Sequence, residues 1–214
     1  MTRRPLLLDL FCGAGGAAVG YHRAGFEVIG VDNRPQPRYP FRFIRGDALA
    51  VLAVLGGLVD AVHASPPCQD HSSLSRMPTY RPHGTADLLP ATRAALLEAG
   101  RPWVIENVPG APMRADYRLC GCLFGLPRLR RERWFETSWG AYELRPPCTH
   151  DGYAVTVTGD GARYSGRRPH IPGYTRAEQA AAMGIGWMSH AELTQAIPPA
   201  YTEHVGAALL EVIG

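Results

Sequence analysis

One cysteine of this chain stands where a catalytic nucleophile could act. Cys68 follows the apolar run 58–64 and the pair Pro66-Pro67. Such a run predicts a buried strand, which the two prolines end and stiffen at its exit. Because ligands of open α/β sheets bind outside the carboxyl ends of the strands, we interpret the Cys68 thiol as a nucleophile. A buried structural cysteine is the alternative.

A carboxylate and two arginines follow at later strands. Glu106 stands near the end of a second short apolar run, residues 103–108. Arg131 and Arg133 alternate in an extended stretch, so both side chains point to one side. Each motif alone is also typical of a solvated charge pattern. Their order after the Cys68 strand indicates one catalytic constellation.

The N-terminal residues have the pattern of a nucleotide-binding loop. An apolar strand, residues 6–10, runs into a glycine-rich turn in which Gly13, Gly15 and Ala18 match that pattern. Glycine lets the backbone approach a ligand closely. Asp32 stands about 20 residues after the first glycine, where a carboxylate can bind the ribose hydroxyls. Glycines kept only for packing are the alternative.

Positioning these groups requires an α/β domain. Strands are expected at residues 6–10, 27–31, 58–64, 103–108 and 131–135. The first helix is expected to end at Gly25. Capping boxes at Thr175 and Ser189 open two short helices. A last helix, residues 200–212, would place Val205, Leu209 and Val212 on one face.

The motifs together resemble those of the DNA cytosine-5 methyltransferases. Residues 9–16 resemble the family's motif for S-adenosyl-methionine, and residues 66–69 its nucleophile motif. Residues 106–108 resemble its glutamate motif, and Arg131 with Arg133 its arginine motif. The likeness covers residues 6–135 and resumes at Tyr174; the layout, with the tail 196–202, is most similar to small phage-encoded members.

The resemblance implies a Rossmann-like fold for S-adenosyl-methionine-dependent methyl transfer, with a mostly parallel sheet flanked by helices. The cofactor-binding residues implied are Phe11, Gly13, Ala14, Gly15, Asp32, Asn33, Asp47 and Pro67. Asp32 would bind the ribose, and Asp47 the adenine amine. Two departures concern this pocket: Asn33 replaces a large apolar residue, and Gln195-Ala196-Ile197 replaces the family's Gly-Asn pair.

The catalytic set implied is Cys68, Glu106, Arg133 and Arg131. Cys68 would add to cytosine C6, Glu106 would share a proton with N3, and Arg133 would hold O2. The glutamate role needs a carboxyl whose pKa is raised by enclosure. The C5 carbon would take the methyl group, after which a base, such as a water, removes the C5 proton. The target base must leave the duplex first.

Contacts to DNA are expected from two polar segments. The segment 69–87 corresponds in the family to a mobile loop over the target. The segment 136–173 is too short for the separate recognition domain of other members, so recognition should be short or loose. The substrate-binding residues expected are Gln69, Ser72, Arg76, Arg81, Asn107, Arg167 and Arg168. Plain surface loops are the alternative for both segments.

We expect one domain over residues 1–214, with a core at 1–136, a reduced recognition segment at 137–173 and a C-terminal part at 174–214. All 22 basic residues are arginine, and the formal net charge is +3. Arginine suits phosphates and base edges. A GC-rich genome explains the missing lysine better, because the bias extends far from any motif.

Localisation in a bacterial cytoplasm is expected, with a phage or prophage origin. The chain shows no signal peptide and no apolar stretch near 18 residues, so we expect neither export nor a membrane span. Five cysteines, an odd number, indicate a reducing compartment. Cys120, Cys122, Cys148 and His150 could form a zinc site, but their spacing is poor for a zinc knuckle. We therefore expect packing or surface thiols and no metal.

Three functions remain open. The first is DNA cytosine-5 methylation, with or without a partner that supplies specificity. The second is cytosine-C5 group transfer to RNA or a free nucleotide, or transfer of a modified cofactor group. The third is an inactive nucleic-acid-binding remnant, against which the presence of Cys68, Glu106 and Arg133 argues. Amino methylation is disfavoured because Pro-Pro-Cys replaces the signature of that class.

Overall fold

A computed structural model describes residues 3–67, 87–141, 146–150, 154–155, 157 and 174–214. It is an α/β domain with a seven-stranded sheet, in the order β3-β2-β1-β4-β5-β7-β6. The strands are β1 (Leu6–Leu10), β2 (Glu27–Asp32), β3 (Arg42–Arg45), β4 (Ala61–Ala64), β5 (Trp103–Asn107), β6 (Tyr117–Leu119) and β7 (Arg133–Thr137). The five strands from β3 to β5 are parallel, whereas β7 is antiparallel to both β5 and β6.

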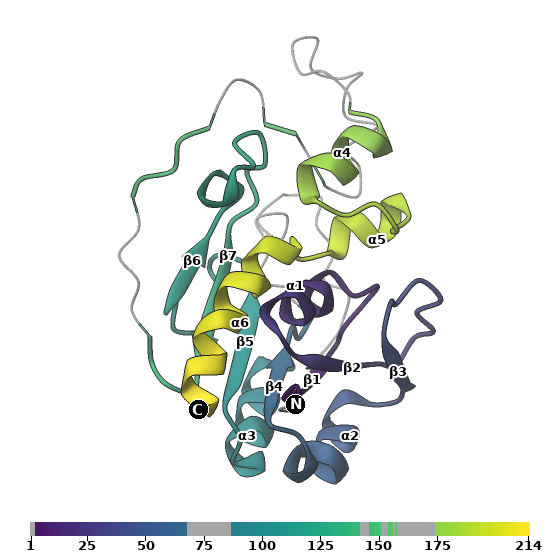
Figure 1. Cartoon of the computed structure of the whole chain (residues 1–214), viewed down its shortest axis with the longest axis vertical. Coiled ribbons are helices and arrows are strands. Elements are labelled where there is room, and N and C mark those ends of the chain that lie inside the picture. The colour runs from purple at the N-terminus through teal and green to yellow at the C-terminus, as the bar shows by residue number, and fades with distance from the viewer. Residues whose placement is uncertain (1–2, 68–86, 142–145, 151–153, 156, 158–173) are drawn as a thin grey trace.

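Helices cover both faces of this sheet (Figure 1). The helices are α1 (Gly16–Ala24), α2 (Ala48–Leu55), α3 (Leu89–Ala99), α4 (Arg176–Met183), α5 (His190–Gln195) and α6 (Pro199–Ile213), with 3-10 turns η1 (Gly56–Leu58) and η3 (Gly121–Phe124). Helices α1 and α6 share one apolar cluster with the sheet, and α2 and α3 share the other. The predicted Rossmann-like architecture is confirmed.

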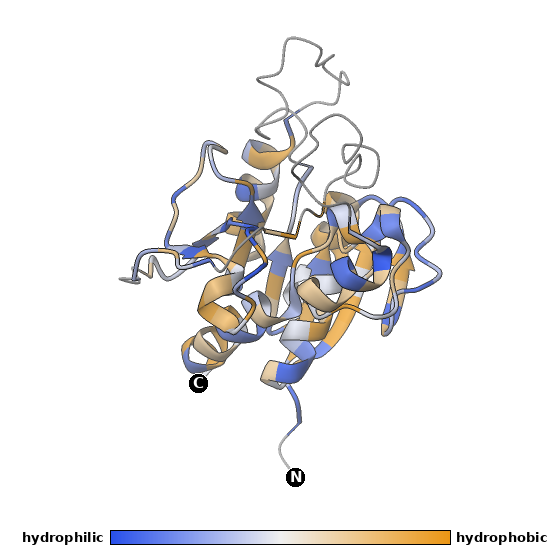
Figure 2. Cartoon of the chain, turned by 90° about the horizontal axis from the view of Figure 1, so that it is seen from above, coloured by the Kyte–Doolittle hydropathy of each residue, from blue (hydrophilic) through white to orange (hydrophobic). Residues whose placement is uncertain are grey.

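The apolar strands supply both layers because successive side chains point to opposite faces. Leu7 packs in the cluster of α1 and α6, whereas Leu8 packs in that of α2 and α3. Val104 and Ile105 divide in the same way on β5. In Figure 2 apolar residues follow the strands between the helical layers. This two-sided burial fixes the strands whose ends carry the site.

Several predicted features are confirmed, and three are corrected. Gly25 ends α1, and both capping boxes form, at Thr175 and at Ser189. The strand expected at 58–64 begins only at Ala61, because the chain turns through η1 before it. The strand expected at 131–135 begins at Arg133 and runs to Thr137, so Arg131 precedes it. Val212 is 42% exposed and does not share the buried face of α6.

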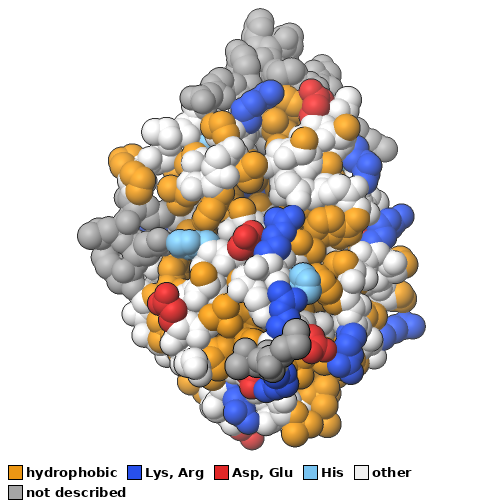
Figure 3. All heavy atoms as spheres, viewed as in Figure 1, with side chains coloured by type: hydrophobic (Ala, Val, Ile, Leu, Met, Phe, Trp, Pro, Cys, Tyr) orange, Lys and Arg blue, Asp and Glu red, His pale blue; other side chains and the backbone are white. Residues whose placement is uncertain are grey.

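Within the part of the chain that the structure describes, no helix is both long enough and apolar enough to cross a membrane. Figure 3 shows arginine side chains among apolar ones on the face that carries α6.

Candidate active site

The strand ends expected to carry the site meet at one edge of the sheet. Strands β1, β2, β4 and β5 run parallel, so their carboxyl ends lie together. Strand β7 runs the opposite way, and its pairing sets Phe135 opposite Glu106 and Trp134 opposite Asn107. The antiparallel register therefore brings the start of β7, and with it Arg133, to the end of β5.

Glu106 and Arg133 form a buried ion pair. The Arg133 Nε lies 3.0 Å from the Glu106 Oε1, and the two side chains are 14% and 7% exposed. Burial raises the pKa of the Glu106 carboxyl, while Arg133, a Ser65 hydrogen bond and Arg131 oppose that rise. The carboxyl is thus enclosed, and its burial favours the protonated form.

A hydrogen-bonded chain that sequence reasoning missed lies behind Glu106. The Tyr21 hydroxyl lies 3.0 Å from His63 Nδ1, and His63 Nε2 lies 2.9 Å from the Ser65 hydroxyl, which reaches Glu106. His63 is fully buried, and burial lowers its pKa to about 3, so the ring is neutral. A histidine inside the apolar strand β4 was the available signal. The chain orients Ser65, and through it the carboxyl.

Arg131 lies beside this pair, but its guanidinium contacts the backbone. Its three nitrogens donate to the carbonyls of Val157, Thr194 and Ala196, at 2.9, 2.8 and 3.1 Å. Its own carbonyl accepts a hydrogen bond from the Tyr201 hydroxyl, 2.8 Å away. These contacts tie the segment before β7 to the C-terminal part. They favour a positioning role over direct contact with a substrate.

Asn107 is fixed in a similar way. Its Nδ2 donates to the Pro66 carbonyl at 3.2 Å, and its Oδ1 accepts from the Val108 amide at 2.8 Å. The side chain is 1% exposed. Asn107 therefore holds the backbone that leads to Cys68, and the expected contact with substrate is not needed to explain its position.

The backbone before the nucleophile is described, but Cys68 itself is not. After Ala64 the Ser65 amide donates to the Leu10 carbonyl at 3.2 Å, and the described segment ends at Pro67, which is exposed. It ends at the same sheet edge as Glu106. The following expected site residues lie outside the described residues: Cys68, Gln69, Ser72, Arg76, Arg81, Arg167 and Arg168.

The loop after β1 has left-handed backbone at Phe11 and at Gly13. Phe11 has φ 57°, the one positive φ of a non-glycine residue among those described. Such strain in a bulky residue is typical of functional sites. Gly13 has φ 49°, and a Cβ built on it would meet no atom within 4 Å. Open space therefore lies over the turn.

Asp32 connects this loop to the end of β2. Its Oδ2 accepts from the Gly13 amide at 3.1 Å, and its Oδ1 accepts from the Arg34 amide at 2.9 Å. A strained turn, an open glycine and a carboxylate on the next strand fit a cofactor with a ribose. Phe11, Gly13 and Asp32 are thus the residues that would hold it.

Gly15 is required for a reason different from the expected one. It has φ 85°, and a Cβ there would come within 2.7 Å of Pro40 Cδ and 3.0 Å of Tyr39 Cδ2. The protein's own chain, not a cofactor, occupies that space. The neighbouring Ala14 is buried, and its carbonyl accepts a hydrogen bond from Trp187 Nε1 at 2.9 Å.

Asn33 and Asp47 lie on the exposed rim of this region. The Asn33 carbonyl accepts from Arg45 Nε at 3.4 Å. Asp47 is the N-cap of α2, and its Oδ1 accepts from the amides of Leu49 and Ala50 at 3.1 and 2.9 Å. The helix cap accounts for an aspartate at 47, whatever else this side chain binds.

Asp9 is buried beneath the loop and has an unsatisfied oxygen. No hydrogen-bond partner of Oδ1 occurs among the described residues, and the Tyr39 hydroxyl lies 3.5 Å from Oδ2. Burial raises the pKa of Asp9 to about 8, opposed by Tyr39 and assisted by the nearby Asp32. Asp9 is therefore protonated at neutral pH.

Comparisons with known proteins agree with this architecture. A scan against models of protein families finds none that matches the chain. The type II methyltransferase M.AgeI of Thalassovita gelatinovora is 26% identical over 178 residues, which cover 65% of this chain and 41% of that protein. The chain thus spans about two fifths of the length of this curated relative.

Solved structures are similar over the whole chain. One is a DNA modification methyltransferase encoded within a prophage (E. coli), with a TM-score of 0.59 and 14% identity over 98% of this chain and 99% of that one. Another is the S. pombe Dnmt2 methyltransferase, with a TM-score of 0.61 and 14% identity over 99% and 100%. The Entamoeba histolytica methyltransferase EhMeth has a TM-score of 0.58 and 10% identity over 100% of both chains. The chain shares the Rossmann-like fold of these methyltransferase structures.

Proposed function

We propose that this chain transfers a methyl group from S-adenosyl-methionine to the C5 carbon of cytosine in DNA. The observation that carries the proposal is the buried Glu106–Arg133 pair, with a 3.0 Å contact at the sheet edge to which the chain before Cys68 leads. An enclosed carboxyl with a raised pKa, an arginine and a thiol are the groups that addition to a pyrimidine ring requires.

The ring chemistry follows from these three side chains. The Cys68 thiolate would form a bond to C6 and push electrons toward C5, while Glu106 offsets the developing charge through N3. Arg133 has N–H groups besides the Nε that contacts Glu106, and these would hold O2. C5 then takes the methyl group that the cofactor supplies. Loss of the C5 proton to a base restores the ring and expels the Cys68 thiolate.

The surrounding contacts keep these groups in place. The chain from Tyr21 through His63 and Ser65 fixes Glu106, and Asn107 fixes the backbone at Pro66. A preorganised site loses little free energy to rearrangement during the reaction. These positions would therefore contribute to the rate without contacting the base.

DNA is the proposed substrate because the prophage structure is a DNA modification methyltransferase by name, and the curated relative is a type II methyltransferase by name. Arg167 and Arg168 are proposed to contact phosphates. The short segment 137–173 offers few side chains that can read bases, and each good bidentate contact contributes only about 1–3 kcal/mol, so recognition is proposed to involve two to three defined bases. A partner subunit would be needed for a longer site.

The test is the nucleoside product. The purified chain is incubated with labelled S-adenosyl-methionine and either duplex DNA or RNA, and the digested nucleosides are separated by mass spectrometry. We expect labelled 5-methylcytosine from DNA, and none with Cys68→Ala or Glu106→Gln. Labelled N4-methylcytosine or N6-methyladenine would contradict the mechanism. Label found only in RNA would contradict the substrate.

A further inference from the structure

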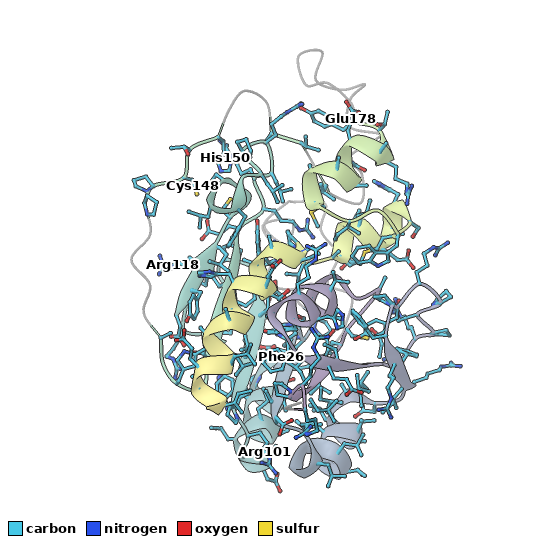
Figure 4. The ribbon with its side chains drawn as sticks, viewed as in Figure 1. Phe26, Arg101, Arg118, Cys148, His150 and Glu178 are labelled. Atoms are coloured by element: carbon cyan, nitrogen blue, oxygen red, sulfur yellow. The ribbon has the colours of Figure 1, made fainter. Side chains whose placement is uncertain are left out.

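Three thiols and an imidazole meet at the edge of the sheet beyond β6. The ligand atoms of Cys120, Cys122, Cys148 and His150 all lie within 4.8 Å of one another. Two of these residues follow β6, and the other two come from the described segment 146–150. Figure 4 shows Cys148 and His150 close together beside the end of the β6–β7 strand pair.

The spacing of the first two cysteines argued against a zinc site, and the local backbone explains why that argument fails. Cys120 is extended, with φ −138°, whereas Cys122 lies in η3. The chain turns between them at Gly121, where a Cβ would come within 2.5 Å of the Leu129 carbonyl oxygen. A tight turn at a glycine replaces the longer spacer of an ordinary knuckle, so both thiols reach one place.

The distances are close to those of a tetrahedral metal site. Zinc lies about 2.3 Å from sulfur and about 2.0 Å from nitrogen, which sets ligand atoms roughly 3.5–3.8 Å apart. The Cys120 Sγ and the His150 Nε2 are 3.5 Å apart. The remaining separations, none above 4.8 Å, need a contraction of about 1 Å at most.

The orientation of His150 is a second, independent observation. Its Nδ1 lies 2.9 Å from the Pro127 carbonyl oxygen. A carbonyl only accepts, so Nδ1 carries the proton and Nε2 presents its lone pair to Cys120. Histidine ligands of metals commonly donate their other ring N–H to a carbonyl in this way. The ring is therefore already in the tautomer that a metal requires.

We propose that Cys120, Cys122, Cys148 and His150 bind one structural Zn²⁺ ion. Three thiolates and one imidazole suit zinc, and four protein ligands complete a tetrahedron, so no position remains for a reacting water. The ion fastens the segment 146–150 to β6 and η3. It thereby anchors an interior part of the proposed recognition segment, which spans 137–173, to the sheet that carries Arg133. The proposal does not depend on the methyl-transfer reaction.

Metal content tests the proposal. The chain is purified under reducing conditions without an affinity metal, and zinc is measured by mass spectrometry of the elements and of the intact native protein. We expect one zinc per chain. Cys148→Ala and His150→Ala should lower that content at least about tenfold. The matched controls Cys12→Ala and His22→Ala, which alter a cysteine and a histidine outside the cluster, should retain it.

A second measurement uses the wild-type chain and requires no variant to fold. Zinc is removed with a chelator, and Co²⁺ is added. We expect the intense visible absorption of tetrahedral cobalt with thiolate charge-transfer bands, which Zn²⁺ then abolishes. The proposal would be overturned if the purified chain contained no zinc and if added Co²⁺ gave only the weak spectrum of octahedral cobalt. A disulfide within the cluster in freshly reduced, zinc-exposed protein would also overturn it.

Discussion

Replacing Arg133 with leucine would leave the Glu106 carboxyl buried without its 3.0 Å charge partner. Removing one partner of a buried pair costs about 3–5 kcal/mol when the other stays charged. Glu106 can escape part of this cost by protonation, because burial already raises its pKa. We therefore expect Arg133→Leu to lower the free energy of unfolding by about 1 kcal/mol at low pH, where Glu106 is protonated and only a hydrogen bond is lost. At higher pH, where Glu106 is charged, the loss should rise to about 3 kcal/mol.

The sign follows from proton binding. With Arg133 gone, the folded-state pKa of Glu106 rises further above its ordinary value of 4.5. At pH values between the ordinary pKa of Glu106 and its higher folded-state pKa, the folded chain binds more protons than the unfolded chain. Stability must then fall as pH rises through this range, and this slope adds to that of the wild type.

Urea unfolding followed by circular dichroism at several pH values measures the difference between variant and wild type. Arg118→Leu is the matched control, because Arg118 lies on neighbouring β6 and its guanidinium stacks on Trp134, 5.1 Å from the ring centroid. Its loss should cost about 0.5–1 kcal/mol at every pH. In a Glu106→Gln background, the pH dependence caused by Arg133→Leu should disappear. An equal loss at all pH values, or a slope that survives Glu106→Gln, would show that Glu106 is not the group that titrates.

Three further predictions address the cofactor loop and the nucleophile turn. Burial raises the pKa of Asp9 to about 8, so wild-type stability should fall as pH rises from about 4 to about 8. Asp9→Asn should remove this slope and stabilise the fold by about 1–3 kcal/mol above pH 8, as measured by unfolding at several pH values. An unchanged slope would mean that Asp9 is not the group that titrates. Asp32→Ala should weaken S-adenosyl-methionine binding by about 1.5–3 kcal/mol in calorimetry, whereas unchanged affinity would mean that the ribose is held elsewhere. Asn107→Ala frees the Pro66 carbonyl, so single-turnover methylation should slow roughly ten- to a hundredfold with cofactor affinity unchanged; an unchanged rate would exclude the positioning role.

Sequence patterns predicted the strands and helices best where burial is two-sided and helix ends are capped. Strands β1, β2 and β5 follow their apolar runs closely, and the capping boxes at Thr175 and Ser189 form as predicted. The run 58–64 misled because apolar residues alone do not separate a strand from a preceding turn; Leu58 is 75% exposed. The proposed division of the chain into core, recognition segment and C-terminal part stays a prediction.

The site was harder to predict wherever it depends on pairing between distant residues. The sheet edge for Glu106 followed from the rule for strand ends, but its 3.0 Å contact with Arg133 depends on the antiparallel register of β7. The contacts of His63 with Tyr21 and Ser65 depend on packing between α1 and β4, which no local pattern encodes. The cysteine cluster likewise depends on a turn at Gly121.

Covalent trapping tests whether Cys68 is the nucleophile. A duplex containing 5-fluorocytosine is incubated with the chain and S-adenosyl-methionine, and the product is digested and mapped by mass spectrometry. Fluorine cannot leave C5 as a proton does, so we expect a stable adduct in which Cys68 is bonded to C6 and the methyl group is on C5. This adduct should be absent from Cys68→Ala. An adduct through Cys12 or another cysteine, or formation of 5-methylcytosine from ordinary DNA with no trapped species, would contradict this role of Cys68.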